Sequence, residues 1–450
     1  MIQSHSTIPM RKHILPLIAI LPAAVVAQTP TIRLINAPDV SSKPEFAMVA
    51  AVRQLAGGRL LVNDIQNRQL TILDPGLANA FILADSTSGL ANSYGTRAGG
   101  LIRYVADSTL FVDPAGLSMF VIDPNGKIAR VASVPRSQDA ASLGNNLLGT
   151  PAVDAAGRLV YRSNGLRLTQ QGGGKGAGGG GGMVMPDFPD TTAIVRVDLS
   201  TRKVDTAAYY KIPKTKMNIV QTDKGTTATN EINPMPIVDE WAVLSNGSIA
   251  IVRGQDYHVD ILHADGAMAS AAKIPFDWQR LSDEEKVAVI DSAKAALDRA
   301  RAAGPADGNA VVAGGGRGGG PGSAPGGMVV MSFRTEASAG DGGGVGTKIA
   351  SMGGGMQPSF VSASELPDYR PAFNQGAARA DEDGNLWVRT SATRAGAIGG
   401  LIYDVINGQG ALVDRVQLPA GRSIVGFGKG GVIYMVARDK AGAWVERTHR

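Results

Sequence analysis

A histidine between two aspartates is the first group in this sequence that could do chemistry. In "GQDYHVD", residues 254–260, His258 has Asp256 and Asp260 at alternating positions. Alternate residues of a strand point to the same side, and a histidine beside a carboxylate can act as a general base or a metal ligand. A half-buried strand histidine without a chemical role is the alternative. Only three histidines follow residue 27 and cysteine is absent, so zinc or copper would find few ligands.

Arginines in or beside turns form a second group. Guanidinium groups that converge on one place bind carboxylates and phosphates, which favours an anionic ligand or a peptide carboxylate. Taken singly, each arginine is better explained as a solvated turn charge, and only the set forms a candidate site. The candidate ligand-binding residues are Asp64, Arg68, Arg253, Asp256, His258, Arg370 and Arg389. Catalytic residues and metal ligands stay unassigned; no cofactor is expected, and a carboxylate-bound calcium ion is the alternative, although EF-hand spacing is missing.

Two standard motifs for cofactor binding or catalysis give no support for an enzyme: one occurs in the wrong context, and the other is absent. "GFGKGG" at 426–431 fits G-x-G-x-x-G but precedes the strand-like "VIYMV", where a dinucleotide-binding fold requires a helix. The chain has no G-x-S-x-G, so a nucleophile elbow of the α/β-hydrolase type is excluded.

The N-terminal residues have the pattern of a secretory signal. Arg11 and Lys12 precede an apolar run over 14–26, and cleavage is expected after Ala27. An uncleaved membrane anchor is the alternative, disfavoured because the run is short for a bilayer. We therefore predict a signal peptide over 1–27 and a periplasmic or secreted protein, monomeric and without a stable membrane span after cleavage.

Charge and composition argue against nucleic-acid binding. Arg11 and Lys12 account for two positive charges, so the formal charge falls from +5 to +3 beyond residue 27. The chain has no basic block and only 5% aromatic residues. The expected partner is a small ligand or a cell-envelope protein.

Short apolar runs closed by turns recur along the chain. "GRLLVNDIQNRQLTILDPG" at 58–76 reads as two strands joined by a polar connection, and "STLFVDPAGLSMFVIDPNG" at 108–126 repeats it. Similar units occupy 157–202, 247–266, 384–410 and 431–450. Most have a further strand on each side, so each unit is predicted to be a four-stranded antiparallel meander. Such units must stack, and a closed ring buries the faces of all of them.

This pattern resembles the six-bladed β-propellers of the NHL or TolB-like kind found in exported bacterial proteins, over nearly all of residues 30–450. The resemblance implies an all-β fold and a single domain over 28–450. The sixth unit has three strands, and "TIRLINAP" at 31–38 is a strand without a unit, so an N-terminal strand is predicted to close the last blade. Seven blades remain the alternative if an insertion hides one.

Three insertions interrupt the repeat. The glycine tract 171–183 and the polar segment 213–236 are predicted to be loops, and the longest insertion, 277–358, combines a helix with glycine-rich sequence. Ser282 and Glu285 form a capping-box pattern at the start of that helix. All three insertions fall on connections that emerge on one face of the ring. Propeller loops converge there on the central channel, which makes this face the expected functional one. The alternative is that long loops accumulate wherever they do not disturb the fold.

Two functions of different classes are compatible with these features. One is a non-catalytic binding or interaction propeller that presents its loop-rich face to a peptide, protein or small anionic ligand. The alternative is a propeller enzyme, such as a metal-assisted lactone hydrolase. The small number of histidines and the missing motifs favour binding.

Overall fold

The structure of the protein is a computed structural model. It describes residues 30–87, 93–145, 148–163, 189–214, 216–222, 225–302, 332–335, 359–391, 400–439 and 442–450. The predicted signal segment, the glycine tract and most of the sequence between 303 and 358 lie outside these residues. No helix of the described part combines the length and the apolar character needed to cross a bilayer.

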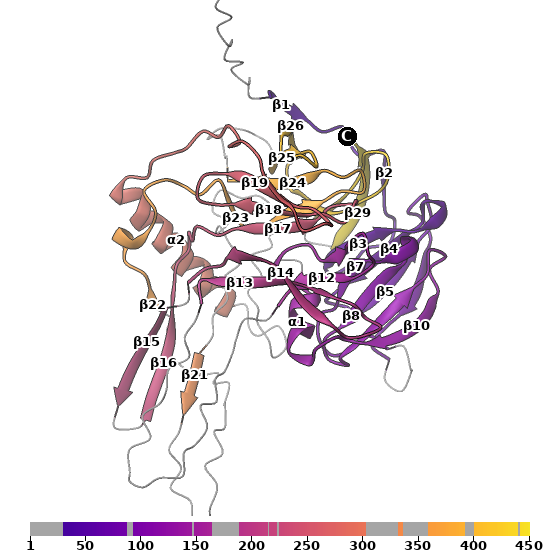
Figure 1. The fold of residues 1–450 in the computed structure, drawn as a ribbon, viewed down its shortest axis with the longest axis horizontal. Helices are drawn as coiled ribbons and strands as arrows, with labels where there is room; N and C mark the ends of the chain where they lie inside the picture. The colour runs from indigo at the N-terminus through magenta and orange to yellow at the C-terminus, as the bar shows by residue number, and fades with distance from the viewer. Residues whose placement is uncertain are drawn as a thin grey trace, which may run out of the picture.

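The described residues form six four-stranded antiparallel blades, arranged in a ring (Figure 1). The first strands of neighbouring blades contact each other, β3 with β7 and β27, and β17 with β11 and β23. First strands therefore surround the ring axis, and fourth strands form the rim. This confirms the predicted six-bladed β-propeller.

Each blade has four strands, which follow one another from the axis outward. Blades one to three consist of β3 (Val49–Gln54), β4 (Leu60–Asp64), β5 (Gln69–Leu73) and β6 (Ala80–Ala84); β7 (Gly100–Arg103), β8 (Thr109–Asp113), β9 (Ser118–Ile122) and β10 (Ile128–Ser133); and β11 (Ala152–Val153), β12 (Leu159–Arg162), β13 (Thr191–Val197) and β14 (Val204–Lys211). Blades four to six consist of β17 (Glu240–Val243), β18 (Ile249–Arg253), β19 (His258–Leu262) and β20 (Met268–Ser270); β23 (Phe373–Ala380), β24 (Leu386–Thr390), β25 (Ile402–Ile406) and β26 (Leu412–Gln417); and β27 (Arg422–Phe427), β28 (Val432–Arg438), β29 (Ala443–His449) and β2 (Val40–Ser41).

A separate hydrophobic cluster fills each of the six interfaces between neighbouring blades. The middle strands are apolar on both faces, as in the fully buried β4, because each blade packs against two neighbours. Trp241 and Trp387 are buried in these interfaces, between blades three and four and between blades five and six. The ring is thus held by repeated face-to-face packing of its blades.

The N-terminal segment closes the last blade, but with residues other than those predicted. The closing strand is β2, which pairs antiparallel with β29. Residues 31–38 instead contain β1 (Ile32–Leu34), a fifth strand that pairs in parallel with β26 on the rim of blade five. Ile35 is 3% exposed and packs between blades five and six. We call residues 32–41 the N-terminal strap, because they span both blades.

The insertions build a small unit beside the ring. Residues 213–236, predicted to be a loop, contain the hairpin β15 (Lys216–Thr222) and β16 (Gly225–Ile232), which β21 (Ser332–Thr335) and β22 (Ser359–Phe360) extend. This side sheet projects away from the ring (Figure 1).

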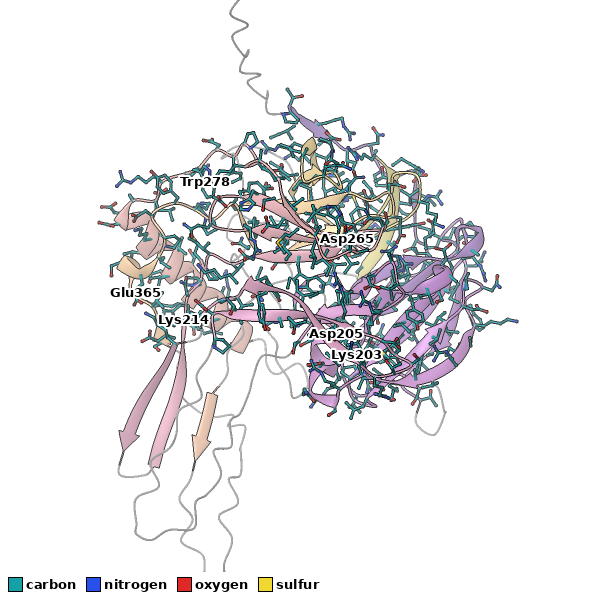
Figure 2. All side chains as sticks on the ribbon, viewed as in Figure 1. Lys203, Asp205, Lys214, Asp265, Trp278 and Glu365 are labelled. Atoms are coloured by element: carbon teal, nitrogen blue, oxygen red, sulfur yellow. The ribbon has the colours of Figure 1, made fainter. Side chains whose placement is uncertain are left out.

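The predicted helix forms α2 (Asp283–Ala302), and its capping box is confirmed. Glu285 N–H donates to Ser282 Oγ at 3.2 Å, and Ser282 N–H donates to Glu285 Oε2 at 2.8 Å. Figure 2 shows Glu365 beside the unit formed by the side sheet and α2. Its carboxylate forms an ion pair with Lys216 at the start of β15. A second short helix, α1 (Ala140–Leu143), precedes blade three.

Candidate functional site

Most predicted site residues lie near the ends of second strands or in the connections that follow them; His258 begins the third strand β19, and Arg370 precedes blade five. In an antiparallel blade, the connection from the second to the third strand and the connection to the next blade emerge on the same side of the ring. We call this side the loop face and the opposite side the turn face. The side sheet and α2 both arise from connections between blades, so these two insertions start from the loop face as predicted.

The blade-four residues form a cluster of charges that satisfy one another. Arg253 Nη1 lies 2.9 Å from Asp239 Oδ2, and its Nε lies 2.7 Å from Asp260 Oδ2. His258 Nδ1 lies 2.6 Å from Asp256 Oδ1, and its Nε2 lies 3.3 Å from Asp260 Oδ1. Burial opposes the charged guanidinium, but hydrogen bonds to the carboxylates outweigh it and raise the pKa of Arg253. The residues that the sequence pattern grouped are neighbours in the structure, but their polar groups pair with one another within blade four.

This cluster does not have the arrangement of a metal site. Within the described ranges, no three acidic or histidine side chains are placed to hold one ion. Asp256 also pairs with Lys273 at 3.3 Å, so its carboxylate is shared between His258 and a lysine.

Asp64 and Arg68 belong to one turn of blade one. Asp64 accepts hydrogen bonds from the backbone N–H groups of Ala47 at 2.8 Å and Met48 at 3.0 Å, and from Asn67 Nδ2 at 2.9 Å. The carboxylate thus ties the turn to the strand entering the blade. Arg68 has a left-handed backbone, with φ of 52°, and is half-buried.

Arg370 lies in the segment that leads into blade five. Its backbone N–H donates to Gln279 O at 2.9 Å, and its buried Nε has no hydrogen-bond partner among the described residues. No contact joins it to Arg253 or His258 in the described part, so these predicted residues do not form a single site.

Arg389 is the predicted residue that leads to a second group of charges near the ring axis. Its neighbour there is Glu240, the first residue of β17, which is 3% exposed and accepts a hydrogen bond from Gly376 N–H of blade five at 2.9 Å. Burial raises the pKa of Glu240 to about 8, although the N–H groups of Gly376 and Ala378 and the charges of Arg389 and Arg162 act in the opposite direction. At pH 7 this carboxyl group is therefore mostly uncharged.

Three arginines interact electrostatically with Glu240: Arg162 at the end of β12, Arg379 on β23 and Arg389 on β24. The register pairs Arg379 with Trp387, so Arg389, two residues further along β24, lies on the same face of blade five. Desolvation lowers the pKa of Arg379, and repulsion from Arg389 adds to this effect. We call these three arginines the axial arginine cluster.

No ion pair within the described residues neutralises the axial arginine cluster. In that part of the chain the side chains of Arg379 and Arg389 make no hydrogen bond, and the buried Arg162 Nε has no partner. Partly buried charge without a counter-charge is costly, and an incoming anion would relieve that cost.

At the turn-face end of the axis, in contrast, the cations are paired. There Arg53 pairs with Glu382, Lys429 Nζ lies 2.8 Å from Asp107 Oδ2, and Arg103 donates to two backbone carbonyl groups of blade four at 2.9 and 3.2 Å. Each of these contacts joins blades that are not adjacent in the ring. Cations at the turn face therefore have protein partners, whereas those of the axial arginine cluster have none within the described ranges.

The sequence pattern did not reveal Glu240, Arg379 and Arg162. Arg162 ends "LVYR" as Arg253 ends "IAIVR", so aligning the second strands of the repeats would have found it. Glu240 and Arg379 lie in first strands, which the packing of blade four against blade five brings together.

Comparisons with known proteins show neither a family nor a function for this chain. The sequence matches no protein-family model, and no curated protein is significantly similar to it. Similar solved structures include virginiamycin B lyase from Staphylococcus aureus, with 10% identity over 91% of this chain and 98% of that chain, and a TM-score of 0.33. A gluconolactonase from Xanthomonas campestris has 12% identity over 93% and 99%, with a TM-score of 0.26. A DUF4221 family member from Bacteroides vulgatus has 9% identity over 93% and 96%, with a TM-score of 0.41. Similarities this low carry no argument about function.

Glu240→Gln should change how stability depends on pH. Folded Glu240 keeps its proton up to about pH 8, whereas the unfolded chain releases it near 4.5, so between these values the free energy of unfolding falls as pH rises. Glutamine removes this loss. Relative to the parent, the free energy of unfolding of the variant should therefore rise by up to ~1.4 kcal/mol per pH unit in this range.

Urea unfolding at several pH values between 5 and 9 measures this margin. Glu284→Gln on the exposed start of α2 is the control and should follow the parent throughout. Parallel curves for the Glu240→Gln variant and the parent would contradict a raised pKa.

Proposed function

We propose that this protein is a binding propeller that holds a small anion, rich in carboxylate or phosphate oxygens, at the axial arginine cluster. The observation that carries the proposal is the set of guanidinium groups, unneutralised within the described residues, beside a carboxyl group that is mostly uncharged at pH 7. Three cations without a counter-charge in that part of the chain give a site that attracts anions. The ligand enters from the loop face, because cations at the other end of the axis already have partners.

Guanidinium geometry favours a ligand with several oxygen atoms. Each guanidinium donates hydrogen bonds in a fixed planar fork, which matches carboxylate and phosphate groups. Arg379 and Arg389 project from one face of blade five, while Arg162 belongs to blade three. A ligand with two or more anionic groups can contact both blades together.

We also propose that the protein is exported and that it does not catalyse a reaction. The signal pattern over 1–27 supports a periplasmic or secreted location, where such a protein would meet solutes or envelope proteins. The alternative, a metal-assisted lactone hydrolase of propeller fold, requires calcium, so calcium and a lactone belong in the same test.

A thermal-shift screen tests this function. Citrate, succinate, phosphate, sulfate, calcium and gluconolactone would be added separately at constant ionic strength. We expect the polyanions to raise the melting temperature by about 3 °C at saturation, since a ligand that binds the folded state stabilises it. Calcium and the lactone should have no effect.

The Arg389→Gln variant locates the effect. It should lose most of the shift produced by the polyanions, and Arg130→Gln on the rim strand β10 should keep it. A shift with calcium that a chelator reverses would instead support the enzyme. No shift with any anion, or equal shifts in both variants, would overturn the proposal.

A further inference from the structure

An open groove of about 620 Å³ lies between blades one and two, away from the axial arginine cluster. Its lining includes Ile72, Leu83 and Ile128, which give it an apolar floor, and Phe81 at its side. Phe81, which lines the groove, is 64% exposed; Ile82, on the other face of β6, is 49% exposed. Exposed apolar side chains around a groove are typical of a surface that binds a partner.

The strand beside the groove has a free outer edge. β6 is the outermost strand of blade one, and no described strand pairs with its outer side. Its sequence, Ala-Phe-Ile-Leu-Ala, contains no charge and no proline. Natural edge strands usually carry charges that prevent pairing with other chains, and β10 and β14 follow this rule with Arg130 and Lys211. β6 lacks that protection.

Blade five shows that a rim strand of this ring accepts an added strand. β1 pairs in parallel with β26, from Ile32 opposite Arg415 to Leu34 opposite Gln417. An ion pair between Arg33 and Asp414 at 2.8 Å accompanies this backbone pairing. The equivalent edge on blade one has the same direction and no such strand in the described part.

Charges at one end of the groove favour an acidic partner. Arg59 and Lys127 line its turn-face end and form no ion pair within the described residues. Asp74, the acidic residue nearby, already accepts hydrogen bonds from Ala78 N–H at 2.8 Å and Asn79 Nδ2 at 2.5 Å, and these bonds lower its pKa. The lowered pKa keeps Asp74 ionised, so two cations and one carboxylate leave a net positive charge at this end of the groove.

We propose that the outer edge of blade one binds an extended peptide segment as an added parallel strand, with apolar side chains against Phe81 and the groove floor. β6 starts at the turn face, where Arg59 and Lys127 lie. In a parallel strand, acidic residues therefore precede the apolar ones. Backbone pairing supplies affinity, and alternate side chains in the groove supply specificity.

Fluorescence anisotropy with three labelled octapeptides tests this surface. One has two glutamates followed by alternating threonine and valine, the second has lysines in place of the glutamates, and the third has the glutamates at the C-terminal end. The first peptide should bind best. Phe81→Ser should weaken its binding at least tenfold, and Lys127→Glu should reverse the preference between the first two peptides.

Tyr209→Ser is the matched control, because Tyr209 is an aromatic residue, 62% exposed, on the rim strand β14. It should bind the first peptide as the parent does. Equal losses in Phe81→Ser and Tyr209→Ser, or no saturable binding up to about 1 mM peptide, would overturn the proposal. Light scattering provides a further check: a dimer that Phe81→Ser abolishes would overturn it too, because a second copy would then occupy the edge.

Discussion

Asp404→Ala should lower the free energy of unfolding by about 3–5 kcal/mol, because it removes a fully buried carboxylate and leaves the half-buried guanidinium of Arg415 without its partner. Asp404 on β25 is 0% exposed. Its carboxylate binds Arg415 at 2.5 Å through Nε and at 3.0 Å through Nη2, and it accepts a hydrogen bond from Tyr257 Oη of blade four at 2.8 Å. The substitution thus removes a polar link between two blades as well as an ion pair.

Asp414→Ala is the matched control for this prediction. Asp414 lies on the next strand and pairs with Arg33 at 2.8 Å and Arg450 at 3.2 Å, but its side chain and its partners are partly exposed. Exposed pairs contribute about 0–1 kcal/mol, so this variant should resemble the parent. Guanidinium chloride unfolding measures both, and similar losses in the two variants would contradict a structural role specific to Asp404.

Ile35→Asp should destabilise the protein by about 3–5 kcal/mol, since it places a charge in the hydrophobic cluster between blades five and six. Ile35 is 3% exposed, and its N–H donates to Gln417 O at 2.9 Å. It anchors the N-terminal strap where the chain crosses from one blade to the next. We therefore expect this side chain to contribute more to ring closure than the short strands β1 and β2.

The same substitution at Ile32 tests whether burial causes the effect. Ile32 lies on β1, three residues away, and is 38% exposed. Ile32→Asp should cost less than about 1 kcal/mol. If both aspartate variants unfold at the same denaturant concentration as the parent, the strap does not contribute to stability.

The blades could be predicted from sequence because each repeats the same local signals. Apolar runs of strand length end in turns such as Asp123-Pro124-Asn125-Gly126, and both strand and turn depend on neighbouring residues alone. The path of the strap could not be read in this way. Ile32 and Leu34 have the alternation of a half-buried strand, yet Ile35 is the buried residue, because the strap follows the gap between two blades.

The hairpin β15–β16 was missed for a different reason. Residues 213–236 are polar, and polarity was interpreted as a loop, although "KMNIVQT" and "GTTATN" are rich in β-branched residues. The strand propensity of these residues indicated a hairpin, but the polar composition of the segment favoured a loop.

The candidate site was predictable only in part. Arg389 follows from its place in a repeat, but Glu240 and Arg379 lie in first strands and become neighbours only when blades four and five pack together. The same applies to Arg253, whose local sequence suggests a free cation. Asp239 and Asp260 neutralise it, and its distance from these carboxylates is a tertiary property that the sequence pattern does not contain.

Isothermal titration of citrate at pH 7 into the parent, an Arg379→Gln/Arg389→Gln double variant and Arg130→Gln tests the central claim most directly. The axial arginine cluster predicts saturable binding to the parent and to Arg130→Gln. Binding to the double variant should be at least a hundredfold weaker, since each hydrogen bond to a charged group contributes about 1.5–3 kcal/mol. Equal affinity in all three proteins, or no binding to the parent, would contradict an anion site at the ring axis.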